Sequence, residues 1–547
     1  MECSPIIECN PKALALGTDS GDLKGFPGFV MQAAKSASAD WTEQESESYE
    51  DTTKIICNAI PTNKEFKDEH NPNILPESTM GMVGKDVRLL SSKMTERVFN
   101  GDLKISNKNV ISVGHLIRDK NVDILVNMED MIKTHFGVFG FTGVGKSNLM
   151  STLVSNLLST EQNLKIVLFD LLDEYTGLLI DQILKNNGKI VCLGEKTLMK
   201  PVFDYVNNPS PDKLESAVKI FLKNILLPKG LKEEKDKFKP SIEKLLKNEK
   251  IKIFEKGFSR TVEDFLTEVW SDVEEKFGST KKGKLREMKN EVFGKNLKDE
   301  LTPELAKDFM NKLGFGKDIL VFLSSVQDVK KDTEMNDRVR YTLVAALKQI
   351  AERSEIEISK HAKIGMEEII EGLNDEDKKS LYLIISHDSH EVRRFANDLG
   401  RYLFINRRIS GRISPLVLCI FDEADQFIPG TPRSESEQLS KYIIETLTRR
   451  GRKFGIGVGI ATQRSSYLDT NIMGQLHTYF ISKLPRQYDR NVVGEAFSLD
   501  PDQFIQTFKF QPGQWLLVSH QAAGIEIPIP IRVLNAENRI KECLSSS

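Results

Sequence analysis

One run of eight residues, GFTGVGKS (140–147), has the composition and spacing to bind a polyphosphate. It fits the pattern G-x-x-x-x-G-K-[ST] without a gap, in which glycines let backbone N–H groups turn toward phosphate oxygens. We expect Lys146 to reach the β- and γ-phosphates of a bound nucleotide, and Ser147 to hold Mg²⁺ through its hydroxyl. The predicted nucleotide-binding residues of this segment are Gly140, Thr142, Gly143, Val144, Gly145, Lys146, Ser147 and Asn148.

An acid at the end of a buried strand is the second part that such a site requires. In LVLCIFDEAD (416–425), Asp422 follows an apolar run of the kind found in central parallel strands buried on both faces. We predict that Asp422 and Ser147 hold Mg²⁺, and that Glu423 is the general base that activates water. A strand end followed by a surface glutamate is the competing interpretation, and the phosphate loop favours the catalytic one.

A third segment, ETLTRRGRKFGIGVGIATQR (445–464), combines basic residues with an apolar strand. Gln463 lies just past this strand, where its amide can contact the γ-phosphate or the attacking water. A guanidinium supplied by a neighbouring subunit raises nucleotide hydrolysis by ~10³–10⁵-fold, and Arg449 or Arg452 is predicted to act in this way. For any one arginine, a cation favoured by the helix C-terminus is an equally good explanation.

These side chains meet only if a parallel sheet positions them. Apolar HFGVFG (135–140) predicts a strand before the phosphate loop, leucines at four-residue spacing predict a helix over 146–160, and KIVLFD (165–170) predicts the next strand. Strand, loop, helix and strand form the opening unit of an α/β domain. The other predicted elements are strands within the runs 381–386, 416–425, 455–463, 478–482 and 515–519 and a helix at 392–408.

Between the two halves of this pattern lies a Lys- and Glu-rich block whose apolar residues recur at helical spacing. We interpret it as an insertion with a solvated charged face. The predicted domains are a small, β-containing N-terminal domain (1–112), the first part of the ATPase core (113–210), the helical insertion (211–378), the second part of the core (379–535) and a C-terminal tail (536–547).

Composition removes several classes of protein. The 547 residues contain 76 Lys and Arg against 79 Asp and Glu, a net charge of −3, which excludes a protein that coats nucleic acid through a bulk positive field. No window approaches the ~20 apolar residues of a membrane span, and the N-terminus lacks a secretory signal. Six scattered cysteines without CxxC spacing favour a reducing, cytoplasmic location.

An ordered set of motifs then resembles a known family. GFTGVGKSN, FDLLDEY (169–175), IFDEAD and RRGRKFGIGVGIATQR look like those of the HerA-type ATPases of the HerA/FtsK superfamily, and QPGQWLLVSH (511–520) with PIPIRV (528–533) resembles their closing strands. The resemblance implies a RecA-like P-loop core in a hexameric ring, which hydrolyses ATP between subunits and moves along double-stranded DNA. It also implies work with a nuclease or another effector enzyme.

The resemblance assigns further residues. Asp170 and Glu174 belong to the acidic motif near the nucleotide, and the arginines and glutamine named above become the interface finger and the sensor. Two departures stand out. Thr134 precedes His135 where family members often carry arginine, so a cis arginine contact is not expected, and the motif centre at 171–173 is less glycine-rich than usual.

Other functions remain open at this point. The absence of N-K-x-D and L-S-G-G-Q stretches disfavours a GTPase and a transporter cassette. A scaffold that switches a nuclease or sirtuin-like NAD-consuming partner in a phage-defence complex is one alternative, with the N-terminal domain as the dock. A secretion or conjugation motor is another. Basic spots that are candidates for DNA contact, although more often ordinary surface arginines, are Arg407, Arg408, Arg412, Arg486 and Arg490.

Overall fold

The computed structural model describes residues 90–194, 197–254, 301–313, 358–497, 507–525 and 527–545, with short stretches within 6–76, 262–299 and 343–348 and residue 504. The chain forms two compact units, Met1–Gly101 and Asp102–Ser547. The elements described in the first unit are two antiparallel strand pairs and one helix. They are β1 (Ile6–Leu14) with β2 (Lys54–Pro61), β3 (Lys64–Phe66) with β4 (Ile74–Pro76), and α2 (Ser92–Asn100).

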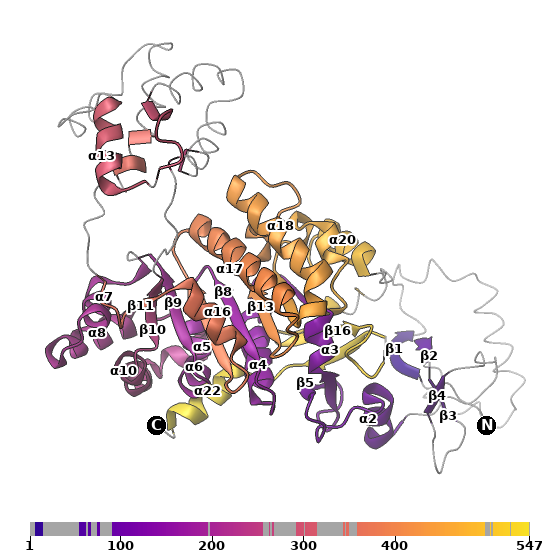
Figure 1. The fold of residues 1–547 in the computed structure, drawn as a ribbon. Helices are drawn as coiled ribbons and strands as arrows, with labels where there is room; N and C mark the ends of the chain where they lie inside the picture. The colour runs from indigo at the N-terminus through magenta and orange to yellow at the C-terminus, as the bar shows by residue number, and fades with distance from the viewer. Residues whose placement is uncertain are drawn as a thin grey trace, which may run out of the picture. The chain divides into compact units, whose positions relative to one another are not determined.

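One large sheet organises the second unit (Figure 1). Its described strands are β5 (Val110–Leu116), β6 (Asp123–Asn127), β7 (Phe136–Phe139), β8 (Lys165–Asp170), β9 (Lys189–Leu193), β10 (Ile251–Phe254), β11 (Lys363–Ile364), β12 (Ser380–Ile385), β13 (Val417–Phe421), β14 (Ile456–Thr462), β15 (Thr478–Ile481), β16 (Gln514–Ser519) and β17 (Ile529–Arg532). Their spatial order is β11-β10-β9-β12-β8-β13-β14-β7-β15-β16-β17-β5-β6. The strands from β11 to β15 run parallel, and the rest continue the sheet antiparallel. The predicted α/β class and every strand predicted between residues 135 and 519 are confirmed.

Helices cover both faces of this sheet, which is why its central strands are continuous apolar runs rather than alternating ones. In β13, Val417, Cys419 and Phe421 join the large core on one face, while Leu418 and Ile420 are equally buried on the other. The first face is covered by α16 (Met366–Asn374), α17 (Ser389–Ser410), α18 (Glu435–Arg450) and α20 (Gln487–Phe497) (Figure 1). The second carries α4 (Lys146–Ser159), α5 (Tyr175–Leu178), α6 (Ile180–Lys185) and α22 (Ala536–Ser545).

The block expected to be a helical insertion, residues 211–378, contains two strands of the sheet. β10 pairs with β9, and β11 pairs with β10. Both strands are short, four and two residues, so their periodicity is hidden among the helical repeats around them. Besides α16, the described helices of this region are α8 (Pro211–Asn224), α9 (Lys229–Lys232), η4 (Lys235–Phe238), α10 (Lys239–Lys247) and α13 (Pro303–Lys312), with α7 (Lys200–Asn207) just before them.

Shorter helices connect the strands. They are α3 (Met128–Lys133), η6 (Ala424–Gln426), η7 (Gly451–Phe454), η8 (Ser465–Tyr467) and α19 (Thr470–Met473). The C-terminal residues expected to be a plain tail instead form α22, whose apolar side chains Ala536, Ile540 and Leu544 are buried. Among the helices of the described ranges, none is both long and apolar enough for a bilayer crossing.

Candidate active site

The phosphate loop connects the end of β7 to the start of α4, at the middle of the sheet. Two of its glycines have backbone conformations that side chains rarely adopt, with φ of 83° at Gly143 and 98° at Gly145. A Cβ at position 143 would meet no atom within 4 Å, so the requirement there is for conformation rather than for space. The Lys146 amine donates to the carbonyl of Gly140 at 3.2 Å. The amine thus lies across the loop whose glycine-rich backbone is suited to direct N–H groups at an anion.

Strand order brings the predicted catalytic residues to this loop. Because β14 lies between β7 and β13, Gln463 at its carboxyl end stands between the phosphate loop and the acids of β13. Its Oε1 accepts a hydrogen bond from Thr142 Oγ1, and its Nε2 donates to Glu423 Oε1 at 3.4 Å. One amide therefore joins the phosphate loop to the predicted base.

The acidic motif after β8 reaches the loop from the other side. Ser147 Oγ donates to Glu174 Oε2 at 2.6 Å. Asp170 accepts hydrogen bonds from the backbone N–H groups of Leu172 at 3.1 Å and Tyr175 at 2.8 Å. These bonds fix the turn that carries Glu174, so Asp170 shapes the site rather than facing the phosphate loop.

Burial dominates the electrostatics of the two strand-end aspartates. It raises the pKa of Asp170 to about 8, against the opposing hydrogen bond from the Tyr175 N–H, and it raises the pKa of Asp422 to about 7, with the charge of Glu423 adding to the effect. A divalent cation would favour the ionised forms of such a crowded set of acids. A serine hydroxyl with carboxylate oxygens is a donor set that suits Mg²⁺, so the residues present fit this ion.

Glu423 occupies a strained position, with φ 48° and ψ 52° in the left-handed region. Such strain in a non-glycine residue concentrates at functional sites. Burial raises the pKa of its carboxyl, and the nearby Lys146 charge acts in the opposite direction. A carboxylate with a raised pKa, aimed by its backbone toward Gln463, has the properties required of a general base.

The predicted arginine fingers are not brought to this site. Arg449 lies in the last turn of α18 and Arg452 lies in η7, so both precede β14, whereas Gln463 follows it. Seven strand residues at ~3.3 Å each separate the two ends by about 20 Å. Arg449 forms an ion pair with Glu445 at 3.1 Å, while the Arg452 guanidinium makes no hydrogen bond or ion pair within the described ranges. Neither arginine can serve the phosphate loop of its own chain in this arrangement.

Thr134, the residue before His135, also lies at the amino ends of the parallel strands, away from the phosphate loop. Thr134 Oγ1 donates to the Asp130 carbonyl at 2.7 Å and thereby helps to end α3. The absence of arginine there is therefore accommodated by a local cap, at the end of β7 remote from the phosphate loop.

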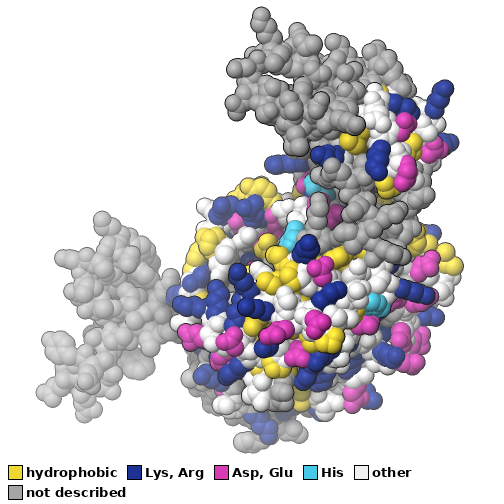
Figure 2. Space-filling view, turned by 90° about the vertical axis from the view of Figure 1, so that its left-hand side faces the viewer, with side chains coloured by type: hydrophobic (Ala, Val, Ile, Leu, Met, Phe, Trp, Pro, Cys, Tyr) yellow, Lys and Arg dark blue, Asp and Glu magenta, His cyan; other side chains and the backbone are white. Residues whose placement is uncertain are grey.

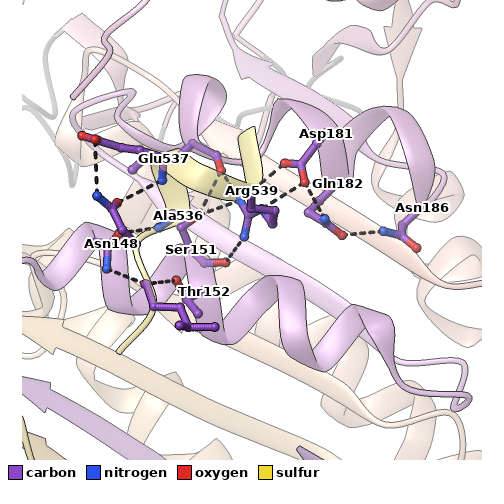
Figure 3. Close-up of polar contacts among 12 residues, drawn as sticks. Asn148, Ser151, Thr152, Asp181, Gln182, Asn186, Ala536, Glu537 and Arg539 are labelled. Atoms are coloured by element: carbon purple, nitrogen blue, oxygen red, sulfur yellow. Dashed lines mark hydrogen bonds and ion pairs between the residues drawn. The ribbon is translucent and has the colours of Figure 1, made fainter. Parts of the chain in front are cut away.

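Sequence reasoning missed the contacts that hold the phosphate-loop helix from the C-terminus (Figure 3). Asn148, predicted to be part of the nucleotide site, uses its amide on the C-terminal segment: its Nδ2 donates to the Leu534 carbonyl at 3.1 Å, and its Oδ1 accepts from the Ala536 N–H at 2.8 Å. The Arg539 guanidinium donates to the Leu178 carbonyl at 2.6 Å and forms an ion pair with Asp181 at 3.0 Å. Nothing in the spacing of a Ser-rich tail indicates such a role.

Of the basic spots considered for DNA, Arg407 is structural. Its guanidinium is fully buried and donates to the carbonyls of Leu373 and Phe454 at 3.2 and 3.0 Å. Arg490 donates to the carbonyls of Leu484 and Pro485 at 2.7 Å each. The side chains of Arg408, Arg412 and Arg486 are exposed.

A phosphate loop at the centre of a mostly parallel sheet, with acids at the ends of the strands beside it, defines a P-loop ATPase. The chain belongs to the HerA helicase family, since residues 111–385, half of its length, match the family model described as "Helicase HerA, central domain". It is 22% identical over 521 residues to the DNA double-strand break repair helicase HerA of Pyrococcus furiosus, which covers 90% of this chain and 80% of that protein.

The chain is also similar to a second helicase and to a solved structure. A probable helicase of Methanocaldococcus jannaschii is 23% identical over 477 residues, covering 86% of this chain and 73% of that protein. Among solved structures, VirB4 of Thermoanaerobacter pseudethanolicus aligns over 80% of this chain and 100% of that chain, with 14% identity and a TM-score of 0.40.

Proposed function

We propose that this protein is an ATP-hydrolysing ring motor that moves along double-stranded DNA. The observation that carries the proposal is the hydrogen-bonded line from Thr142 through Gln463 to Glu423, because it links the phosphate loop to a base poised beside it. Glu423 takes a proton from the attacking water, and Gln463 reports the state of the γ-phosphate to β14.

The remaining groups bind and orient the nucleotide. Lys146 and the loop N–H groups hold the β- and γ-phosphates, and Ser147 and Asp422 are the residues that would hold Mg²⁺. The bound ion supplies positive charge against the phosphate oxygens. Ser147 Oγ donates to Glu174 in this structure, so Glu174 lies beside the hydroxyl that would hold the ion and would add negative charge there.

Hydrolysis by this mechanism needs a second copy of the chain. Arg449 and Arg452 lie at the amino ends of the strands, whereas the phosphate loop of the same chain lies at the carboxyl ends. The surface beside them suits such an interface. On α18, Tyr442 is 69% exposed and lies seven residues before Arg449, on the same helix face. On the adjacent α17, Ile409 is 80% exposed. Apolar side chains this exposed favour a protein partner, and a closed hexameric ring is the assembly we propose.

The relatives named "DNA double-strand break repair helicase" support DNA as the substrate of this chain, and we take it to be double-stranded. The face in Figure 2 shows Lys and Arg among Asp and Glu over its described surface, in keeping with a net charge of −3. An outer surface of mixed charge does not attract DNA strongly. We therefore place the DNA contacts in the ring's channel, with the exposed Arg408, Arg412 and Arg486 as candidates.

The test is ATP hydrolysis with and without blunt duplex DNA, over a salt titration. We expect duplex DNA to stimulate hydrolysis, and the affinity for DNA to fall steeply with salt because bound counterions are released. Lys146→Ala provides the background rate. If the hydrolysis rate is the same with and without DNA, and no salt-dependent binding is seen, the translocase function is excluded. The alternative is then a scaffold whose state is timed by nucleotide hydrolysis.

An effector partner, either a nuclease or a sirtuin-like NAD-consuming enzyme, is the finer part of the proposal, and service in antiviral defence is its extension. The N-terminal unit is the proposed dock, because small appended domains often carry partner contacts. Since β5 begins at Val110 inside the main sheet, a deletion that spares the motor must end near Gly101. This deletion should retain hydrolysis and lose co-purification with the effector; retained co-purification would place the dock elsewhere.

A further inference from the structure

His135 is a buried histidine at the amino end of β7, far from the phosphates. Its side chain is 2% exposed, and its φ is 65°, a left-handed value that few residues other than glycine adopt. Both ring nitrogens are used. Nδ1 accepts a hydrogen bond from the Val458 N–H at 3.0 Å, and Nε2 lies 2.8 Å from the carbonyl oxygen of Thr448. These partners require the neutral ring with its proton on Nε2, which donates to Thr448.

The two bonds join three elements that matter for hydrolysis. Thr448 is in the last turn of α18, where carbonyls lack intrahelical partners, and it immediately precedes Arg449. Val458 lies in β14, the strand that ends next to Gln463. His135 immediately precedes β7, which ends at the phosphate loop. A single imidazole therefore fastens the end of the arginine-bearing helix to the two strands that reach the nucleotide site.

Arg452 lies close enough to this corner for its charge to act on the ring. It is among the groups that lower the pKa of His135 and of the neighbouring His477, although burial is the largest cause in both. Burial lowers the pKa of His135 to about 4, so the ring stays neutral and its two hydrogen bonds persist throughout the physiological pH range.

We propose that His135 is a positioning residue that holds the end of α18 so that Arg449 and Arg452 are presented to the nucleotide of the adjacent subunit. The inference rests on the proposed hydrolysis between subunits. A shift of β7 or β14 on nucleotide binding is then passed through the imidazole of His135 to the arginines. These arginines lie about 20 Å from the nucleotide site, at the other end of β14. His135 acts on the neighbour's site and not on its own.

The experiment compares His135→Phe, which keeps a ring and loses both hydrogen bonds, with His135→Gln, which retains one donor and one acceptor. Each full-length variant is measured for nucleotide affinity, ring assembly and the hydrolysis rate. We expect wild-type affinity and assembly, a fall in hydrolysis of about 10²-fold for His135→Phe through misplacement of the arginines, and a smaller fall for His135→Gln.

Mixed rings provide the decisive measurement. In a ring of His135→Phe and Lys146→Ala subunits, some interfaces pair an intact phosphate loop from the first with correctly held arginines from the second. Hydrolysis by the mixed rings should therefore exceed the sum of the two variants measured alone. A defect of packing or of the variant's own site would not be complemented in this way, and no recovery would overturn the proposal.

Arg452→Ala and Arg449→Ala, mixed with Lys146→Ala in the same way, separate two kinds of failure. If one of them is complemented and His135→Phe is not, the arginines act between subunits and only the role of His135 is wrong. If neither arginine variant is complemented, hydrolysis between subunits fails, and the role of His135 fails with it. Should His135→Phe not fold, the same mixing with His135→Gln decides the question.

Discussion

The parallel strands of the central sheet have their carboxyl ends on one side (the carboxyl-end edge) and their amino ends on the opposite side (the amino-end edge). These two sides differ in charge and in the partners of their side chains. At the carboxyl-end edge, Glu174 accepts a hydrogen bond from Ser147 of the phosphate loop, Glu423 accepts one from Gln463, and burial works against the ionised aspartates. At the amino-end edge, Arg452 makes no ion pair within the described ranges, and the buried His135 is held neutral. In the proposed ring, the carboxyl-end edge of one chain and the amino-end edge of its neighbour would together form one site.

The difference explains how one chain stays folded before it assembles. Exposed arginines remain hydrated, so leaving Arg452 unpaired at the surface costs little. Buried acids are costly, and Asp170 and Asp422 avoid part of that cost by binding protons more readily. Four changes test or sharpen this contrast, in order of decreasing expected effect.

Lys146→Ala should abolish function at the carboxyl-end edge. Without the amine that lies across the loop at Gly140, the β- and γ-phosphates lose their main cationic contact, and both ATP binding and hydrolysis should be lost. Titration with a fluorescent ATP analogue measures the binding. Lys133→Ala, on α3 at the other edge, is the matched control and should bind normally. A variant at Lys146 that binds ATP with wild-type affinity would contradict the loop assignment.

Arg452→Ala should lower hydrolysis by about 10³-fold or more while leaving ATP affinity intact, because the guanidinium contributes only to a neighbour's transition state. Arg449→Ala is the matched comparison, since Arg449 is already engaged by Glu445 at 3.1 Å and is expected to lose less. Steady-state hydrolysis by assembled rings measures both. The reverse ranking would make Arg449 the finger.

Glu423→Gln should bind ATP and hydrolyse it about 10²–10⁴-fold more slowly, because the amide cannot accept the proton from water. The substitution preserves size, and the amide can still bond to Gln463. Single-turnover hydrolysis separates this step from nucleotide binding. Glu435→Gln, in the first turn of α18, should leave the rate unchanged. Normal turnover by Glu423→Gln would show that another group is the base.

The smallest effect concerns pH and the amino-end edge. The unfolded chain protonates His135 near its ordinary pKa of 6.5, but the native chain only near 4, so between these values the unfolded state binds more protons and stability falls as pH falls. At pH 5 the cost is about 2 kcal/mol. Asp170 and Asp422, whose pKa values are raised, act in the opposite sense, with stability lost as pH rises.

The difference between wild type and His135→Gln isolates the histidine, since both aspartates are common to the two proteins. Urea unfolding at pH 7.5 and pH 5.0 should show the stability advantage of wild type shrinking by about 2 kcal/mol at the lower pH. An advantage that does not change with pH would mean that the native protein accommodates the protonated ring.

The sequence predicts the parts of the site that lie next to one another in the chain. GFTGVGKS and the strand-end pair Asp422 and Glu423 are local patterns with local reasons. It does not predict that β14 lies between β7 and β13, because strand order is set by packing among elements far apart in the chain. The line from Thr142 to Glu423 follows from that order. The burial of Arg407 was missed for the same reason, since its carbonyl partners come from three separate segments.

The sequence also does not predict the shortest strands or the contacts made by the C-terminal segment. β10 and β11 belong to the sheet because β10 pairs with β9 and β11 pairs with β10. Strands of four and two residues are too short to show a strand periodicity in the sequence. Asn148 was assigned to the nucleotide because it belongs to the motif, whereas its amide is committed to the segment 534–536. Such contacts depend on where the chain returns after hundreds of residues.

The antiparallel end of the sheet has a consequence for biosynthesis. β5 pairs with β17, and Leu116 faces Ile531 across a sequence separation of about 415 residues. At about 5–20 residues per second, a ribosome needs on the order of 20–80 s to make the intervening chain. For that interval β5 has β6 on one side and an open hydrogen-bonding edge on the other, and such edges recruit unintended strands. The hydrogen-bonding edge of β5 therefore stays open in the nascent chain until β17 (Ile529–Arg532) has been translated, and crowding on polysomes should lower the yield more than it affects the folded protein.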